Sequence, residues 1–173
     1  MRSLFNTGRE SILGKEEAEV QKPAIRTRAP NDRKERILVM DDDAFIRGII
    51  RSMLMESGYE IRVAGNGIQA IEYFKEAKAS GNPFDAVILD LIVPSGMGGD
   101  KALEGLRVID PEVKAILLTG DINHPAIKHY PVLGFKTAVI KPFILDELLQ
   151  AIRHASDPSR YSEESNPGEN SMV

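Results

Sequence analysis

The sequence predicts an α/β fold, a doubly wound (βα)5 three-layer sandwich with helices on both faces of a parallel sheet. Short apolar runs alternate with longer segments of helical periodicity, which is the pattern of repeated strand–helix units. Apolar runs such as Ala-Val-Ile-Leu at 86–89 lack polar alternation, as expected of strands that are covered on both faces. The repeated strand–helix–strand connections imply right-handed crossovers.

Five strands are expected, and all of them are short. They lie at 36–40, 60–64, 86–89, 114–118 and 137–140. Residues 60–64 alternate polar and apolar side chains, whereas the other four segments are mainly apolar runs, each followed by a polar residue.

Capping residues mark the ends of the first two helices. Asp43 can cap the first helix and Gly58 can end it, while Asn66-Gly67 opens the second. The apolar residues that recur at helical spacing in the first helix are Ile46, Ile49, Ile50, Met53 and Leu54. The residues of the second helix that we expect to face inward are Ile68, Ile71 and Phe74.

Prolines bound the next two helices. The third ends before Asp110-Pro111, because the residue before a proline avoids the helical conformation. Pro125 suits the first turn of the fourth helix, and Pro131 limits that helix to little more than two turns. The apolar positions are Ala102, Leu103, Leu106 and Ile109 in the third helix, and Leu145, Leu148, Leu149 and Ile152 in a fifth.

The composition indicates a soluble, cytoplasmic protein with one folded domain. A formal net charge of -4 leaves no electrostatic footprint for nucleic acid. The absence of cysteine excludes disulfides and thiolate metal sites, and no apolar stretch is long enough to cross a membrane. We expect the domain at 36–155, between a disordered mixed-charge arm at 1–35 and a disordered acidic tail at 156–173.

Polar residues follow four of the expected strands at their carboxyl ends. Asp41 and Asp42 follow the first strand, Asp90 the third, Thr119 the fourth and Lys141 the fifth. The carboxyl ends of parallel strands meet at one edge of the sheet, where α/β proteins bind ligands. Thr119 can donate a hydrogen bond to a phosphoryl oxygen there, and Lys141 can supply positive charge.

Three carboxylates at one edge require a cation, because like charges raise one another's pKa. Mg²⁺ prefers oxygen ligands, and we expect Asp41 and Asp42 to hold it directly or through water. The backbone carbonyl of Ile92 is a plausible further ligand. Asp90 would give one oxygen to the ion and use the other as a nucleophile, which would form an aspartyl phosphate.

These motifs resemble the receiver domain of two-component response regulators. The matching pieces are Ile-Leu-Val-Met-Asp-Asp-Asp at 37–43, Asp-Leu-Ile-Val-Pro at 90–94, Leu-Thr-Gly at 118–120 and Ile-Lys-Pro-Phe at 140–143. The resemblance covers about 36–155 and implies a flavodoxin-like fold with sheet order 2-1-3-4-5. Residues 83–90, followed by Gly-Met-Gly-Gly at 96–99, are most similar to the receivers of hybrid histidine kinases.

The resemblance also implies roles and partners. Asp90 becomes the phosphoacceptor, Asp41 and Asp42 the Mg²⁺ acids, Thr119 the switch hydroxyl and Lys141 the phosphate-binding lysine. The phosphoryl donor would be a sensor histidine kinase or a histidine phosphotransfer protein. Such a protein catalyses only its own phosphorylation and dephosphorylation, so it is not an enzyme in the usual sense. It signals by protein–protein contacts to a downstream target, or it relays the phosphoryl group.

The sequence departs from the receiver pattern at two places. Ala138 stands where the family usually has an aromatic residue, three positions before Lys141, and the loop at 95–99 is one residue longer than the commonest version. We therefore expect the fourth helix to switch by ordering and disordering in place of an aromatic rotation. At a position that tunes loss of the phosphoryl group, Ile92 is apolar and cannot orient a water molecule, which predicts slow dephosphorylation.

Two other classes of protein share parts of this pattern. Asp41-x-Asp43 resembles the start of a haloacid-dehalogenase-type phosphatase, but Phe45 is unusual for that class and Asp90 would have no role in it. A pseudo-receiver, which binds partners without being phosphorylated, is the other alternative, and Ala138 is compatible with it. Uptake of a phosphoryl group distinguishes the receiver from the pseudo-receiver, and turnover of a phosphate ester identifies the phosphatase.

Overall fold

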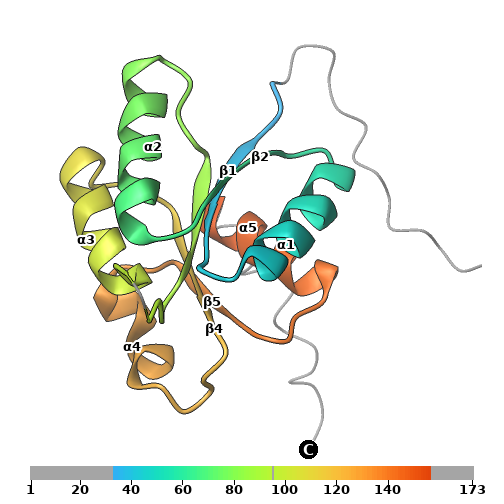
Figure 1. The fold of residues 1–173 in the computed structure, drawn as a ribbon, viewed down its shortest axis with the longest axis vertical. Coiled ribbons are helices and arrows are strands. Elements are labelled where there is room, and N and C mark those ends of the chain that lie inside the picture. Colours follow the sequence, from blue (N-terminus) through green and yellow to red (C-terminus); the bar gives the residue numbers. More distant parts are fainter. Residues whose placement is uncertain (1–32, 95, 157–173) are drawn as a thin grey trace, which may run out of the picture. The chain divides into compact units, whose positions relative to one another are not determined.

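The computed structural model describes residues 33–94 and 96–156, which form five alternating strand–helix units (Figure 1). The strands are β1 (Arg36–Met40), β2 (Glu60–Ala64), β3 (Ala86–Asp90), β4 (Ala115–Thr119) and β5 (Thr137–Ile140). The helices are α1 (Ala44–Glu56), α2 (Gly67–Ala79), α3 (Gly99–Ile109), α4 (Pro125–Leu133) and α5 (Leu145–Ser156). The alternation predicted from the sequence is therefore confirmed in every unit.

The five strands form one parallel sheet in the order β2-β1-β3-β4-β5, as expected. The crossover after β2 brings β3 to the other side of β1, so β1 and β3 are neighbours in the centre. Helices α2, α3 and α4 cover one face of the sheet, and α1 and α5 cover the other (Figure 1). The topology is that of a doubly wound, flavodoxin-like sandwich.

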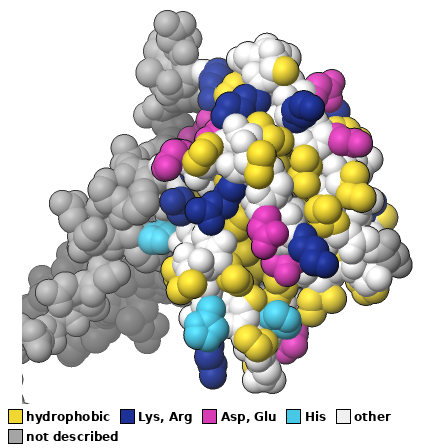
Figure 2. All heavy atoms as spheres, turned by 90° about the vertical axis from the view of Figure 1, so that its left-hand side faces the viewer, with side chains coloured by type: hydrophobic (Ala, Val, Ile, Leu, Met, Phe, Trp, Pro, Cys, Tyr) yellow, Lys and Arg dark blue, Asp and Glu magenta, His cyan; other side chains and the backbone are white. Residues whose placement is uncertain are grey.

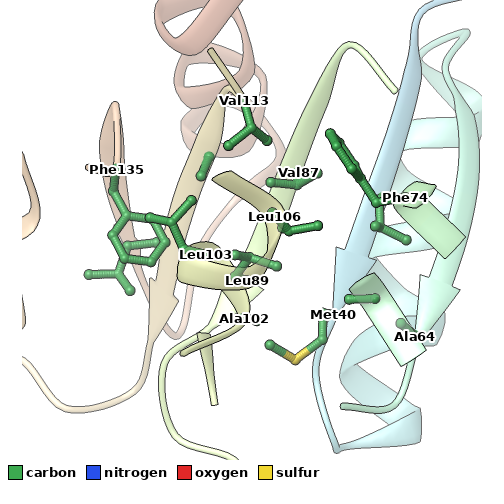
Figure 3. Packing of buried hydrophobic residues seen from close by; sticks show 14 of the residues in the cluster. Met40, Ala64, Phe74, Val87, Leu89, Ala102, Leu103, Leu106, Val113 and Phe135 are labelled. Carbon is green, nitrogen blue, oxygen red and sulfur yellow. The ribbon is translucent and has the colours of Figure 1, made fainter. Parts of the chain in front are cut away.

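Each face of the sheet has its own hydrophobic core, because successive side chains of a strand point to opposite faces. Leu38 and Met40 of β1 point toward α2 and α3, whereas Ile37 and Val39 belong to the cluster beneath α1 and α5. In the first cluster, Phe74 of α2 and the leucines of α3 close over β1 and β3 (Figure 3). All residues of β1, β3 and β4 except Arg36 are buried, which explains their unbroken apolar sequences.

Side-chain caps begin three of the helices. The Asp43 carboxylate accepts hydrogen bonds from the amides of Phe45 and Ile46, at 2.8 and 3.4 Å. The Asn66 side chain accepts one from Gln69 at 3.0 Å, and these two caps were expected. His124 Nδ1 also accepts a hydrogen bond from the amide of Ala126, at 3.1 Å, which gives this histidine a capping role.

Two details of the helices differ from the expectations. Ile68 is 56% exposed, because the buried stripe of α2 consists of Gly67, Ala70, Phe74 and Ala77 and not of the larger apolar residues alone. Helix α4 has nine residues, which matches the predicted length, but it continues for two residues past Pro131. It ends at Gly134, whose left-handed φ of 100° allows its amide to bond back to Pro131 O at 3.1 Å.

The amino-terminal boundary of the domain is held by Arg33, which forms an ion pair with Asp85 at 2.6 Å. Arg33, which lies in the segment expected to be an arm, thus contacts the domain. Residues 1–32 and 157–173 lie outside the described residues. No helix in the described part of the chain is long and apolar enough to cross a membrane. On the face that carries α2, α3 and α4, acidic and basic side chains are interspersed with hydrophobic ones (Figure 2).

Candidate functional site

The three aspartates predicted to bind a metal ion lie together at the carboxyl edge of the sheet. Asp41 and Asp42 follow β1, Asp90 ends β3, and these two strands are paired neighbours. One carboxylate oxygen from each aspartate lies within 4.8 Å of those of the other two. Asp41 and Asp90 are buried, whereas Asp42 is exposed, so the cluster has one side open to solvent.

Lys141 joins two of these aspartates. Its Nζ lies 2.6 Å from Asp41 Oδ2 and 2.8 Å from Asp90 Oδ2. The backbone amide of Lys141 donates a 2.7 Å hydrogen bond to Thr119 O, which fixes the start of the chain segment after β5 beside β4. The expected lysine therefore reaches across β4 and β3 to the central acids.

Burial and the neighbouring lysine act in opposite directions on the Asp90 carboxylate. Burial raises the pKa of Asp90 above its ordinary value, and the hydrogen bond from Lys141 offsets only part of that rise. Burial lowers the pKa of Lys141, but its hydrogen bonds to Asp41 and Asp90 outweigh burial, so the pKa of Lys141 is raised. Lys141 is thus held as a cation. The site still disfavours ionisation of Asp90, because Asp90 would be a second buried negative charge beside Asp41.

Thr119 is fully buried at the end of β4, next to β3 and β5. Its Oγ1 accepts a 3.1 Å hydrogen bond from the amide of Asp121, which orients the hydroxyl group within the turn that follows β4. The hydroxyl hydrogen remains available for a different acceptor. The structure therefore places Thr119 on the strand adjacent to that of Asp90, with its hydroxyl group able to donate a hydrogen bond to a ligand.

The glycines at the start of α3 have a packing role beside Asp90. A Cβ on Gly99 would lie 2.7 Å from Asp90 O, and one on Gly98 would overlap the carbonyl of Leu91. Any larger residue would push the helix away from the strand end. Ile92, two positions after Asp90, has a side chain that is 46% exposed at the rim of the site.

Arg47 of α1 was not predicted from the sequence to be part of the site. Its Nη1 donates a 2.6 Å hydrogen bond to the backbone carbonyl of Asp41, so it contacts the turn that carries two of the three acids. The feature of the sequence that could have identified Arg47 is its distance from the helix cap. Arg47 lies four residues after the helix cap Asp43, on the side of α1 that faces back to the turn.

Residues 37–153 match the family model described as response regulator receiver domain. The chain belongs to this family. The receiver identified from its motifs is thus confirmed, and the matched segment includes all the residues predicted for the site. The particular similarity to receivers of hybrid histidine kinases stays a prediction.

The relatives of this receiver include bacterial proteins of sporulation and chemotaxis. It is 32% identical over 119 residues to sporulation initiation phosphotransferase F of Bacillus subtilis, which covers 69% of this chain and 91% of the relative. It is 34% identical over 118 residues to the chemotaxis protein CheY of Bacillus subtilis, which covers 68% and 93%. Among solved structures, a receiver domain protein from Clostridium thermocellum superposes with a TM-score of 0.64 at 26% identity, covering 74% of this chain and 98% of that one.

Proposed function

We propose that this receiver accepts a phosphoryl group on Asp90 from a phosphohistidine, in a reaction that depends on Mg²⁺. The observation that carries the proposal is the environment of the Asp90 carboxylate, which touches Lys141 and lies within 4.8 Å of two further acids. Two of its relatives, a phosphotransferase and CheY, share this domain over more than nine-tenths of their length. The phosphorylated domain would then act on a downstream protein or pass the phosphoryl group on.

The acidic cluster fits a small, hard cation. Asp41, Asp42 and Asp90 supply three oxygen donors, which is the ligand type that Mg²⁺ prefers. Two oxygens bound to one Mg²⁺ lie at most about 4.2 Å apart, so separations within 4.8 Å are close to what a shared ion requires. The receiver domain of a Pseudomonas aeruginosa sensor histidine kinase, 23% identical to this chain, was solved with magnesium in its active-site cleft.

When bound, Mg²⁺ would neutralise charge on the phosphoryl oxygens and on the carboxylates. We assign the Ile92 carbonyl as a further ligand, as the sequence suggested. The Asp90 oxygen attacks phosphorus, the P–N bond of the phosphohistidine breaks, and its electron pair stays on the imidazole. Lys141 is already in place to pair with a phosphoryl oxygen, and the Thr119 hydroxyl can donate to another.

Three exposed apolar side chains that are near site residues in the sequence suit a docking protein. Phe45, Ile92 and Ile144 are 72%, 46% and 62% exposed, although all three are large and hydrophobic. Each lies within three positions of a site residue in the sequence: Asp42, Asp90 and Lys141, respectively. We infer that the phosphodonor, a histidine kinase or a histidine phosphotransfer protein, packs on the rim formed by these three side chains.

Both classes of donor present their histidine in the cytoplasm, which we propose as the compartment in which this protein acts.

The contacts of Asp43 count against the phosphatase alternative. In that reading Asp43 would be the second catalytic aspartate, but its carboxylate accepts hydrogen bonds from Phe45 N and Ile46 N as the cap of α1. These hydrogen bonds hold the carboxylate of Asp43 against the first turn of α1, so it is occupied by the helix and not directed at a substrate. A pseudo-receiver would keep the same fold without taking up phosphate, so an experiment has to separate it from the proposed function.

Intact-mass measurement tests the proposal directly. We expect one added phosphoryl group after incubation with Mg²⁺ and acetyl phosphate, none in Asp90→Asn, and none when EDTA is present. No adduct on the folded wild-type protein would support the pseudo-receiver. Steady hydrolysis of a phosphate ester by both wild type and Asp90→Asn would instead support the phosphatase.

A further inference from the structure

Asp41 is held at each of its polar atoms by a different partner. Its amide donates to Ala64 O at 3.2 Å, and its Oδ1 accepts from Asp43 N at 2.8 Å. Its Oδ2 contacts Lys141, and its carbonyl oxygen accepts from Arg47 Nη1 at 2.6 Å. The partners come from β2, the turn itself, the segment after β5 and α1. The first acid of the cluster is therefore fixed before any metal ion binds.

Asp42 is in a different position. It is exposed, and none of the described side chains contacts its carboxylate through a hydrogen bond or an ion pair. Its orientation therefore depends on the backbone on either side. The carbonyl of Asp41 lies in the peptide plane that joins Asp41 to Asp42, because the peptide bond is planar. A donor on that carbonyl sets the plane from which the Asp42 side chain projects.

Arg47 is that donor, and its location is unfavourable for the helix alone. It lies in the second turn of α1, whose first turn has no acidic residue, near the positive end of the helix dipole. The helix dipole does not favour a cation there, whereas the hydrogen bond to the turn at Asp41 does. The guanidinium lies beside Gly65, where a Cβ would make an ordinary van der Waals contact with Arg47 Nη1 at 3.7 Å. The guanidinium is also half-buried, which strengthens its bond to the carbonyl.

We propose that Arg47 is a positioning residue for the metal site: it fixes the Asp41–Asp42 peptide plane and thereby aims the Asp42 carboxylate at the ion. This inference rests on the proposed function, because it assumes that Asp41, Asp42 and Asp90 bind Mg²⁺. Loss of an outer partner of a metal ligand typically weakens metal affinity by about tenfold or more. Arg47 does not touch the phosphoryl group in this scheme, so it governs binding of the ion and not the chemical step.

The test is Mg²⁺ binding measured by isothermal titration calorimetry on the full chain, without phosphodonor, for Arg47→Met and Arg47→Lys. Arg47→Met is expected to raise the Kd for Mg²⁺ about tenfold, and Arg47→Lys to restore part of the affinity by keeping a donor. Arg51→Met is the matched control, because Arg51 is an exposed arginine one turn further along the same helix. Melting in EDTA shows that each variant is folded.

Phosphorylation by acetyl phosphate as a function of Mg²⁺ supplies the second readout. Arg47→Met should need about tenfold more Mg²⁺ for half-maximal rate, while its rate at saturating Mg²⁺ stays within about twofold of wild type. An unchanged Kd in folded Arg47→Met would overturn the inference and leave the proposed function intact. If wild type neither binds Mg²⁺ nor takes up phosphate, the proposed function itself fails. A fall in saturated rate with unchanged Kd would make Arg47 part of the chemistry and also overturn the inference.

Discussion

Lys141 Nζ lies 2.8 Å from Asp90 Oδ2 and 2.6 Å from Asp41 Oδ2, so one ammonium group serves two buried carboxylates from neighbouring strands. The lysine is 51 residues from Asp90 and 100 from Asp41 in the sequence. The parallel sheet brings the three together because Asp41 follows β1, Asp90 ends β3 and Lys141 follows β5, all at one edge. In the absence of a metal ion, the ammonium group of Lys141 supplies the positive charge that pairs with Asp41 and Asp90.

Replacing Lys141 should therefore affect both stability and chemistry. Lys141→Met leaves Asp41 and Asp90 buried without their cation, and we expect the free energy of unfolding to fall by about 1–3 kcal/mol at neutral pH in EDTA. Added Mg²⁺ should restore much of this loss. Phosphorylation by acetyl phosphate should slow by about 100-fold or more, because the charge aimed at the phosphoryl oxygens is gone.

Urea unfolding with and without Mg²⁺ measures the first effect, and the rate of mass increase measures the second. Lys136→Met is a suitable control, since Lys136 is exposed and lies before β5, at the opposite end of that strand from Lys141. Equal stability of Lys141→Met and wild type in EDTA would show that the ion pairs contribute no net stability.

The raised pKa of Asp90 predicts a pH dependence. In the folded protein this pKa lies above the unfolded value of about 3.9, so folding favours the protonated carboxyl group. The stability contributed by Asp90 is complete below the unfolded pKa and is lost as the pH rises through the folded pKa. Asn mimics the neutral form, so Asp90→Asn should melt at a higher temperature than wild type at pH 7 in EDTA.

The advantage of Asp90→Asn should shrink as the pH falls toward about 4 and vanish below it. Melting curves of both proteins across this range give the difference directly, because the groups outside the site titrate alike in the two. Asp85→Asn serves as a comparison, since that aspartate is paired with Arg33 outside the site. A constant difference at all pH values would mean that the change acts through packing and not through ionisation.

The sequence was sufficient to predict the fold and most of the site, for identifiable physical reasons. Asp90, Thr119 and Lys141 each stand at the carboxyl end of an apolar strand. Because the strands are parallel, these residues must lie at the same edge of the sheet. Ile68 could not be placed, because small residues define the buried stripe of α2 and let a larger residue point to solvent. Arg47 could not be found from sequence either, since its role depends on the direction of one backbone carbonyl.

Phe45 should contribute to recognition of the phosphodonor protein and not to the chemistry. Its ring is 72% exposed at the start of α1, beside the acidic turn. Large side chains at the centre of an interface often contribute most of its affinity. We expect Phe45→Ala to slow phosphotransfer from a purified histidine kinase that phosphorylates wild type by about tenfold or more, and to leave acetyl phosphate labelling unchanged.

Met55→Ala is the matched control for Phe45→Ala. Met55 is 51% exposed on the same helix, but it lies at the far end of α1 from the site. Both variants should react with acetyl phosphate as wild type does. If Phe45→Ala and Met55→Ala transfer equally fast from the kinase, the rim around Asp90 is not the docking surface.

Ile92 should make the aspartyl phosphate long-lived. Its side chain is apolar and partly exposed beside the acceptor, so it offers no hydrogen bond that would orient a water molecule for attack. We expect Ile92→Asn to shorten the half-life of the phosphorylated state by about tenfold or more, as followed by intact mass after removal of acetyl phosphate. Ile144→Asn, an exposed isoleucine on a different loop, should leave it unchanged. A wild-type half-life of seconds would refute the expectation.

Helix α4 is the element that we expect to respond to phosphorylation. Ala138 of β5 packs against the same core as Tyr130 and Ala126 of α4, and it has no ring that could rotate between two positions. Pro131 lies inside this nine-residue helix and removes one of its backbone donors, which lowers the cost of opening it. Amide exchange in 121–136 should therefore change several-fold on phosphorylation, while exchange in α2, which packs far from β5 in the sheet order, should stay constant. Unchanged exchange in 121–136 would exclude an order–disorder switch and would direct attention to the exposed rim beside Asp90.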